Sequence, residues 1–402
     1  MKKNYLLLVF LVTCFATHSQ YNIKGKVLSY KKLPLEGASV YSNNTTFGTI
    51  TNSKGEFEFK INEGIHDLVV SFIGFETQQI KINTNTPIVS LTFTLKPNTN
   101  LLDEVKITKT IYDNNWKYNL FRFKLALLGR NQIAKTCRIL NEKELHFNFD
   151  VKTNTLTAFA KKPLKIKHSG LGYLITYDLI DFTLEGNNLF YSGYARYENL
   201  KKSIKKKWVQ NRRKAYNGSK MHFFRSIITN TTKEEGFIIN QFKRLPNLAR
   251  PSDEKIKQAR DFLKLHKGPI YYSKKIITPK TSIDSALVIV RKESLSKFAD
   301  YMYKTDISSN TIAYKNEGSY FLNFDNYLSV VYTKEPEELG YVTSIFGKKR
   351  EPLNSQTSNI ILFNGSSEIN FYGILNNPNS IFTEGYWSYE SFANMLPLDY
   401  IP

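Results

Sequence analysis

The sequence predicts a mainly β protein in which a small N-terminal sandwich precedes a larger, antiparallel β-rich α+β domain. At 402 residues the chain is longer than one ordinary core serves, so two or three domains are expected. Its 28 Phe and 25 Tyr favour strands, because bulky planar rings fit a pleated surface. Many short segments alternate apolar and polar residues between Gly, Pro and Asn, which is typical of strands with one buried face.

Residues 1–19 have the features of a secretory signal peptide. Lys2 and Lys3 supply the positive start, the apolar stretch behind them is too short to span a bilayer, and small residues precede Gln20. No later apolar run is long enough for a transmembrane helix. We therefore expect an exported protein, periplasmic or associated with the outer membrane, with no transmembrane helix in the mature chain.

The first of the two cysteines, Cys14, raises lipidation as an alternative to simple signal-peptide cleavage. Residues 11–14 resemble a bacterial lipobox, which would lead to lipidation of Cys14, but Thr13 stands where such sites carry Gly, Ala or Ser. Cleavage before Gln20 instead leaves Cys137 as the one cysteine of the mature chain, so no intrachain disulfide is then possible. We expect Cys137 to be a small buried apolar residue.

The charge of the chain is strongly positive. It has 56 basic and 35 acidic residues, a formal charge of +21. Removal of residues 1–19 takes away two lysines and no acid, which leaves +19. In an exported protein this charge indicates an acidic envelope partner or an anionic outer-membrane surface, such as lipid head groups or phosphorylated glycolipid, and not nucleic acid.

Residues 20–108 are expected to form the first domain, and its most informative segment is a turn followed by a strand. Residues 52–55 are a polar turn that ends in Gly, and in 56–61 apolar and charged residues then alternate, which predicts a strand that leaves a tight turn. Further strands are predicted at 21–29, 38–40, 66–75, 79–82 and 89–96. Short strands with regular spacing and turn residues between them predict a small all-β sandwich.

These segments also carry a family resemblance. The motifs that carry it follow in order at 25–27, 34–40, 48–57, 70–75 and 102–105. Together they resemble the carboxypeptidase-D regulatory-like domain, a transthyretin-like, seven-stranded sandwich common at the N-terminus of TonB-dependent outer-membrane transporters. The chain departs from that family at Asn52, where Asp is usual, although Asn can form the same local turn.

The resemblance implies a non-catalytic accessory domain and not a peptidase. A zinc carboxypeptidase needs a His-x-x-Glu pair, and none of the six histidines is followed by Glu three residues later. The sequence also contains no Gly-x-Ser-x-Gly elbow, Walker loop or Cys-x-x-Cys pair. We expect no catalytic residue, metal or cofactor. The alternatives are a hydrolase or glycan-processing enzyme with its site in the C-terminal domain, and a carbohydrate-binding module.

Residues 109–402 are expected to form the β-rich α+β domain. Helical spacing over 116–127, with Asp113 or Asn114 as its cap, predicts a helix that packs on its own domain. Other helices are predicted at 251–266 and 387–396, and strands at 145–149, 155–160, 164–168, 173–184, 189–197, 286–290, 319–324, 327–332, 359–363 and 368–372. Segments such as 216–219, 222–226 and 396–400 resemble the region found behind this regulatory-like domain in other envelope proteins, which implies a location but no activity.

Three polar residues lie within the predicted meander. His146 alternates with apolar neighbours, so we expect it on the polar face in contact with solvent. Asp178 and Asp181 are three residues apart on one strand. In regular strand geometry they point to opposite faces, so we expect no carboxylate dyad.

Residues 201–214 form the main basic run, with eight Lys or Arg. Trp208, Arg212 and Tyr216 recur at a spacing of four, which predicts a helix, and Ser219 can cap a second one. Three interpretations follow: a helix-turn-helix DNA reader, an anionic membrane or glycolipid site, or a solvated basic face on a structural hairpin. The signal peptide opposes the first, because it takes the chain away from DNA.

The two predicted helices supply the candidate anion- or surface-binding residues. Besides the basic run, His222 and Arg225 stand close together and could bind an anion with Lys220. A structural histidine is the competing interpretation of His222, since no carboxylate partner can be located from the sequence. The candidate set is Lys205, Lys206, Lys207, Arg212, Arg213, Lys220, His222 and Arg225.

Overall fold

The computed structural model describes residues 20–86, 90–98, 111–186, 188–273, 276–346, 350–363, 365–370, 372–377 and 380–402. The predicted signal peptide, the lipobox-like segment and the motif at 102–105 lie outside the described residues. Among the residues described, no helix is long and apolar enough to cross a membrane.

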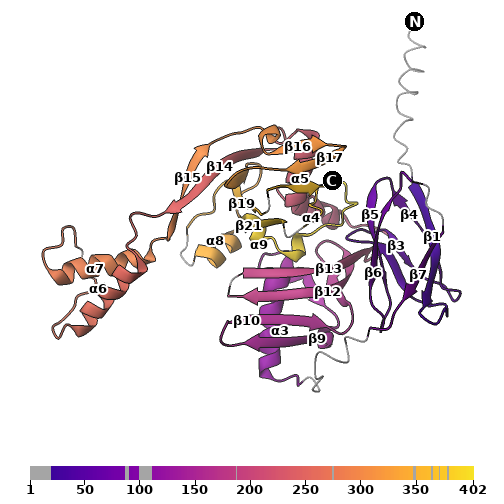
Figure 1. Cartoon of the computed structure of the whole chain (residues 1–402), viewed down its shortest axis with the longest axis horizontal. Helices are drawn as coiled ribbons and strands as arrows, with labels where there is room; N and C mark the ends of the chain where they lie inside the picture. The colour runs from indigo at the N-terminus through magenta and orange to yellow at the C-terminus, as the bar shows by residue number, and fades with distance from the viewer. Residues whose placement is uncertain are drawn as a thin grey trace, which may run out of the picture.

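The N-terminal part is a sandwich of two sheets, seen on the right of Figure 1. One sheet has the order β4-β1-β7 and the other β3-β2-β5-β6. The strand bounds are β1 Gln20–Ser29, β2 Ser39–Ser42, β3 Gly48–Ile50, β4 Glu56–Asn62, β5 Ile65–Ser71, β6 Gln78–Asn83 and β7 Leu91–Leu95. The inward side chains of both sheets, such as Ile23, Phe57 and Leu68, form one buried core. The predicted sandwich is therefore present.

The turn between β3 and β4 forms as its sequence predicts. The Asn52 side chain accepts hydrogen bonds from the backbone N–H groups of Lys54 and Glu56, each at 2.9 Å. Gly55 has φ +71°, which favours glycine, and a Cβ there would meet the carbonyl oxygen of Val27. Asn52 thus makes the local bonds that an Asp would make, and the turn does not depend on a carboxylate.

A six-stranded antiparallel sheet follows, with β8 to β12 in the order β8-β11-β12-β10-β9 and β13 paired to β12. Its bounds are β8 Cys137–Ile139, β9 Leu145–Asp150, β10 Thr155–Ala160, β11 Leu164–His168, β12 Tyr173–Glu185 and β13 Asn188–Asn199. Helix α3 (Asn114–Leu127) is capped by Asp113, and its buried Phe123 and Leu127 belong to the core of this sheet. The prediction that this helix packs on its own region is confirmed.

Two expectations about this sheet are wrong, for local reasons. His146 is only 9% exposed because its ring stacks on Phe159 of the paired strand, 4.8 Å between ring centroids. Asp178 and Asp181 both lie off the buried face, because a β-bulge after Leu179 shifts the alternation of β12 by one residue. Each carboxylate has its own hydroxyl partner, Thr77 for Asp178 and Ser192 for Asp181.

Cys137 packs against the same core and is partly buried. Burial raises the pKa of its thiol to about 12, so the reactive thiolate is disfavoured at neutral pH. This matches a packing role for the side chain.

A five-stranded sheet, β15-β14-β18-β19-β21, and a small sheet, β16-β17-β20, complete the strands. Their bounds are β14 Phe237–Pro246, β15 Phe298–Lys304, β16 Ala313–Asn316, β17 Ser319–Leu322, β18 Tyr327–Tyr332, β19 Gln356–Leu362, β20 Ser367–Ile369 and β21 Ile381–Gly385. The helices beside them are α4 Lys206–Tyr216, α5 Lys220–Thr229, α8 Leu339–Phe346 and α9 Tyr386–Tyr389. Phe223 and Phe224 of α5 are buried in the core of these sheets.

Two helices form an arm between β14 and β15. Helix α6 (Asp253–Leu265) and helix α7 (Ser282–Arg291) lie at the far left of Figure 1, beyond the ends of these long strands. The strand predicted at 286–290 is wrong, because Ala286 and Leu287 pack on α6 as one face of a helix. A short apolar run does not by itself distinguish a buried strand from a helix. The terminal helix predicted at 387–396 is also shorter, since α9 ends at Tyr389.

The sandwich contacts the second region through several hydrogen bonds. The backbone N–H of Asn44 donates to the carbonyl of Ala195, and the N–H of Leu398 donates to the carbonyl of Asn44, both at 2.7 Å. His66 is buried, and its ring lies 3.3 Å from the hydroxyl of Tyr372. These contacts join the sandwich to segments far away in the sequence.

Candidate functional site

The candidate residues lie on the hairpin of α4 and α5, but they do not share one environment. Lys205, Lys206 and Lys207 at the start of α4 are exposed, and so is Arg213 near its end. Ser219 caps α5 by accepting a hydrogen bond from the N–H of His222, as its sequence position predicts. The four exposed cations form what we call the α4 basic surface.

Arg212 is buried and its donors are used within the protein. Its Nε donates to the carbonyl of Leu171 at 2.8 Å, and its Nη2 donates to the side chain of Asn199 at 2.8 Å. The guanidinium lies over the ring of Tyr173, 3.8 Å from the centroid. This side chain therefore fixes α4 to the β12–β13 hairpin.

Arg225 holds the C-terminal tail. Its three nitrogens donate to the carbonyl oxygens of Tyr372, Tyr400 and Leu398, each at 2.8 Å. A planar fork of donors suits several fixed carbonyl groups at once. Because these donors already have partners, Arg225 does not stand ready for an external anion.

His222 is a buried residue with both ring nitrogens engaged. Nδ1 accepts a hydrogen bond from the N–H of Gly218 at 3.1 Å, and Nε2 lies 3.1 Å from a carboxylate oxygen of Glu235. The ring also stacks on Tyr216. Burial lowers the pKa of His222, although Glu235 acts in the opposite direction. With neither nitrogen open, the imidazole is not available as a general base.

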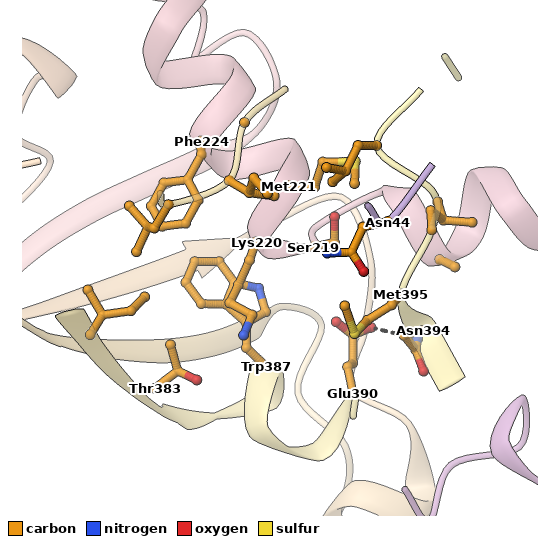
Figure 2. A pocket seen from close by; sticks show the side chains of 17 residues that line it. Asn44, Ser219, Lys220, Met221, Phe224, Thr383, Trp387, Glu390, Asn394 and Met395 are labelled. Atoms are coloured by element: carbon orange, nitrogen blue, oxygen red, sulfur yellow. Dashed lines mark hydrogen bonds between the residues drawn. The ribbon is translucent and has the colours of Figure 1, made fainter. Parts of the chain in front are cut away.

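A pocket of about 270 Å³ lies beside α5, where Lys220 is one of its lining residues (Figure 2). Its walls come from α5, from the β21–α9 segment, from the C-terminal tail and, through Asn44, from the sandwich. Its apolar lining comprises Ala215, Met221, Phe224, Ile374, Leu375, Ile381, Trp387, Met395, Leu396 and Leu398. An apolar cavity with a few polar groups is the usual form of a small-molecule site.

The polar side of the pocket carries one acid, Glu390, and one base, Lys220. Burial, and to a smaller extent the nearby carboxylates of Glu335 and Glu338, raise the pKa of Glu390 to about 8, although Lys220 and Lys214 act in the opposite direction. The amide of Asn394 donates to Glu390 at 3.3 Å. Such a carboxyl can change its charge near neutral pH, and the hydroxyl of Ser219 in the lining is engaged as the cap of α5.

The structure thus divides the eight candidate residues into three groups. Four form the exposed α4 basic surface, Arg212, His222 and Arg225 are engaged within the fold, and Lys220 lines the pocket. Sequence reasoning missed Glu390 and Trp387, because more than 150 positions separate them from α5 and no local pattern marks them. Among the described residues, no three His, Cys, Asp or Glu come together as a metal-binding group.

Comparison with known proteins concerns the sandwich. Residues 23–107 match the family model of the CarboxypepD_reg-like domain. Over 88 residues the chain is 35% identical to the TonB-dependent receptor SusC of Bacteroides thetaiotaomicron, and over 90 residues it is 31% identical to the TonB-dependent receptor P39 of Formosa agariphila. Each match covers 22% of this chain and 8% of the receptor, so the chain corresponds to a small part of these relatives.

The second region has no informative match among these findings. The solved structure of a 9R-lipoxygenase from Cyanothece PCC8801 aligns with 54% of this chain, and the alignment covers 48% of the lipoxygenase chain. With 11% sequence identity and a TM-score of 0.16, this likeness supports no fold assignment. The family model and the two receptors all match the sandwich. Residues 23–107 are a CarboxypepD_reg-like domain, and their similarity to TonB-dependent receptors indicates an envelope-associated protein.

Proposed function

We propose that the chain is an exported, non-catalytic component of the cell envelope that acts by binding, in the periplasm or at the outer membrane. The observation that carries this proposal is the similarity of residues 23–107 to TonB-dependent receptors. In this proposal residues 1–19 direct export, residues 20–108 are the accessory sandwich, and residues 109–402 form the domain that binds an envelope partner. It is a proposal about the chain as a whole, of which the matched part is about a fifth.

The chemistry of the candidate residues supports binding over catalysis. His222 is the one histidine of the α4–α5 hairpin, and its two nitrogens already have partners. Arg212 and Arg225 stabilise the packing of helices and tail. The residues of the α4 basic surface, in contrast, face solvent.

We assign the α4 basic surface to contact with an anionic envelope surface. Lys205, Lys206, Lys207 and Arg213 are all exposed, so their charges can approach phosphate or carboxylate groups, and Lys205 also lies over the ring of Trp208, 5.4 Å from its centroid. An isolated lysine adds about 1 kcal/mol of attraction near an anionic membrane, so several together have a measurable effect.

The test is fractionation of Gram-negative cells that express a tagged chain, combined with in-cell crosslinking. The proposal expects the processed protein in the envelope fraction. The triple variant Lys205→Glu, Lys206→Glu, Lys207→Glu should lose envelope association. A cytosolic protein, or a triple variant that fractionates like the wild type, would contradict the proposal.

A control with the same change of charge separates this surface from net charge alone. Lys24, Lys60 and Lys81 are exposed lysines on strands of the sandwich. Their triple change to Glu alters the net charge by the same amount and should leave envelope association intact. If both triple variants detach equally, the binding depends on overall charge and the assignment to the α4 basic surface is wrong.

A further inference from the structure

The arm of α6 and α7 folds around a small core of its own. Ala259 and Leu263 of α6 pack on Ala286 and Leu287 of α7. Figure 1 shows the two helices at the end of the β14–β15 ribbon, away from the other sheets. The arm therefore has a packed core of its own.

The end of α6 and the connection to α7 carry large apolar side chains that are exposed to solvent. Leu265 is 82% exposed and Ile277 is 87% exposed, with Tyr271 at 67% and Tyr272 at 62%. A guanidinium nitrogen of Arg291, the last residue of α7, donates to the carbonyl of Tyr272 at 2.7 Å and so holds the connection against α7. Large exposed apolar side chains on a protruding arm mark an interaction surface.

The charge of the same segment is one-sided. From residue 262 to residue 283 the sequence has five lysines and no Asp or Glu. Lys267 and Lys280 are exposed beside the apolar residues. We call Leu265, Lys267, Tyr271, Tyr272, Ile277 and Lys280 the arm tip.

We propose that the arm tip binds the interface of an anionic lipid bilayer. Leucine and isoleucine can enter the acyl boundary, tyrosine rings suit the head-group level, and lysines can reach the lipid phosphates along their aliphatic stems. Anionic lipid complements the positive charge of the segment. A second copy of the chain does not, because two arm tips would bring four lysines together and no acid belongs to either.

This inference rests on the proposed export to the envelope but concerns a surface separate from the α4 basic surface. The two are distinguishable because the arm tip combines apolar side chains with charge. Binding through the arm tip should respond to loss of Leu265 and Ile277, even though that change leaves the net charge unaltered.

The test uses the protein purified after export and vesicles of phosphatidylcholine with or without phosphatidylglycerol. We expect co-sedimentation with the anionic vesicles, weaker binding to phosphatidylcholine alone, and loss of binding at high salt. The double variant Leu265→Ser, Ile277→Ser should bind the anionic vesicles about tenfold more weakly. Both positions are exposed, so the variant should keep the wild-type thermal unfolding midpoint.

The matched control is the double variant Ile73→Ser, Val151→Ser, which removes two exposed aliphatic residues elsewhere on the protein, 66% and 78% exposed. It should bind like the wild type. Equal binding by the arm-tip variant and the wild type would overturn the proposal, and so would equal binding to both kinds of vesicle. Light scattering without lipid adds a check: a dimer that the arm-tip variant abolishes would show that a second copy is the occupant.

Cell fractionation keeps the two proposals separate. If the wild-type protein is found in the envelope but the arm-tip variant binds vesicles as strongly as the wild type, only the arm-tip inference is refuted. A protein that is never exported refutes the proposed function, whatever the vesicles show.

Discussion

The carboxylate of Asp399 accepts a hydrogen bond from the backbone N–H of Thr46, 2.8 Å away, and another from the Thr46 hydroxyl. The two residues are 353 positions apart, and their contact joins the C-terminal tail to the sandwich. The neighbouring bond between Leu398 and Asn44 repeats the connection through the backbone. The tail therefore connects the CarboxypepD_reg-like domain to the rest of the chain.

Replacing Asp399 should weaken this junction. Asp399→Ala leaves the Thr46 N–H without its acceptor, which should lower the free energy of unfolding by about 1 to 3 kcal/mol. Urea denaturation measures the change. Asp261→Ala is the control, because Asp261 pairs with the exposed Lys264 on α6 and its loss should change stability by no more than about 0.5 kcal/mol. Equal effects of the two variants would show that the junction adds little.

Arg225 should be sensitive even to a conservative change. Arg225→Lys retains the charge but loses the planar fork that serves the carbonyls of Tyr372, Leu398 and Tyr400. We expect a loss of about 2 to 4 kcal/mol in stability, with faster proteolysis of the tail. Arg213→Lys, on the exposed face of α4, should leave both measurements unchanged. A stable Arg225→Lys protein with a protected tail would contradict the anchoring role.

The contribution of His222 should depend on pH. Because burial lowers its pKa in the folded protein, the unfolded chain binds a proton more readily, and stability from the neutral ring is lost as pH falls below about 6.5. The stability difference between the wild type and His222→Gln should therefore be largest near pH 7 and shrink on acidification. Thermal unfolding midpoints over this range provide the measurement, and a constant difference would argue against a neutral buried ring.

Glu390 should show the opposite trend. Its pKa of about 8 lies above the ordinary value of 4.5, so ionisation of this carboxyl costs the folded protein stability as pH rises between these values. Glu390→Gln removes that cost. We expect the variant to gain on the wild type by up to about 1.4 kcal/mol per pH unit across this interval and to level off above pH 8.

A control for Glu390 is Glu185→Gln, at an exposed position at the end of β12. It should follow the wild type over the same range. Unfolding measured at several pH values between 5 and 9 tests both variants. A Glu390→Gln curve parallel to that of the wild type would mean that the folded protein does not raise the pKa of Glu390.

The sequence by itself determined those features that depend on neighbouring residues. The turn at Asn52, the caps at Asp113 and Ser219 and the strands of the sandwich follow from local hydrogen bonds and from alternation with a period of two. The family resemblance rested on the same segments. These were predictable because the physics that forms them acts within a few residues.

Only the tertiary structure decided which polar residues are available. Stacking on Phe159 buries His146, a bulge turns Asp181 to the face of Asp178, and packing on α6 makes a helix of an apolar run that resembles a strand. The pocket is likewise lined by residues that are far apart in the sequence, such as Asn44 and Leu398. Local periodicity contains no information on such long-range neighbours, because they are chosen by the packing of whole sheets and helices.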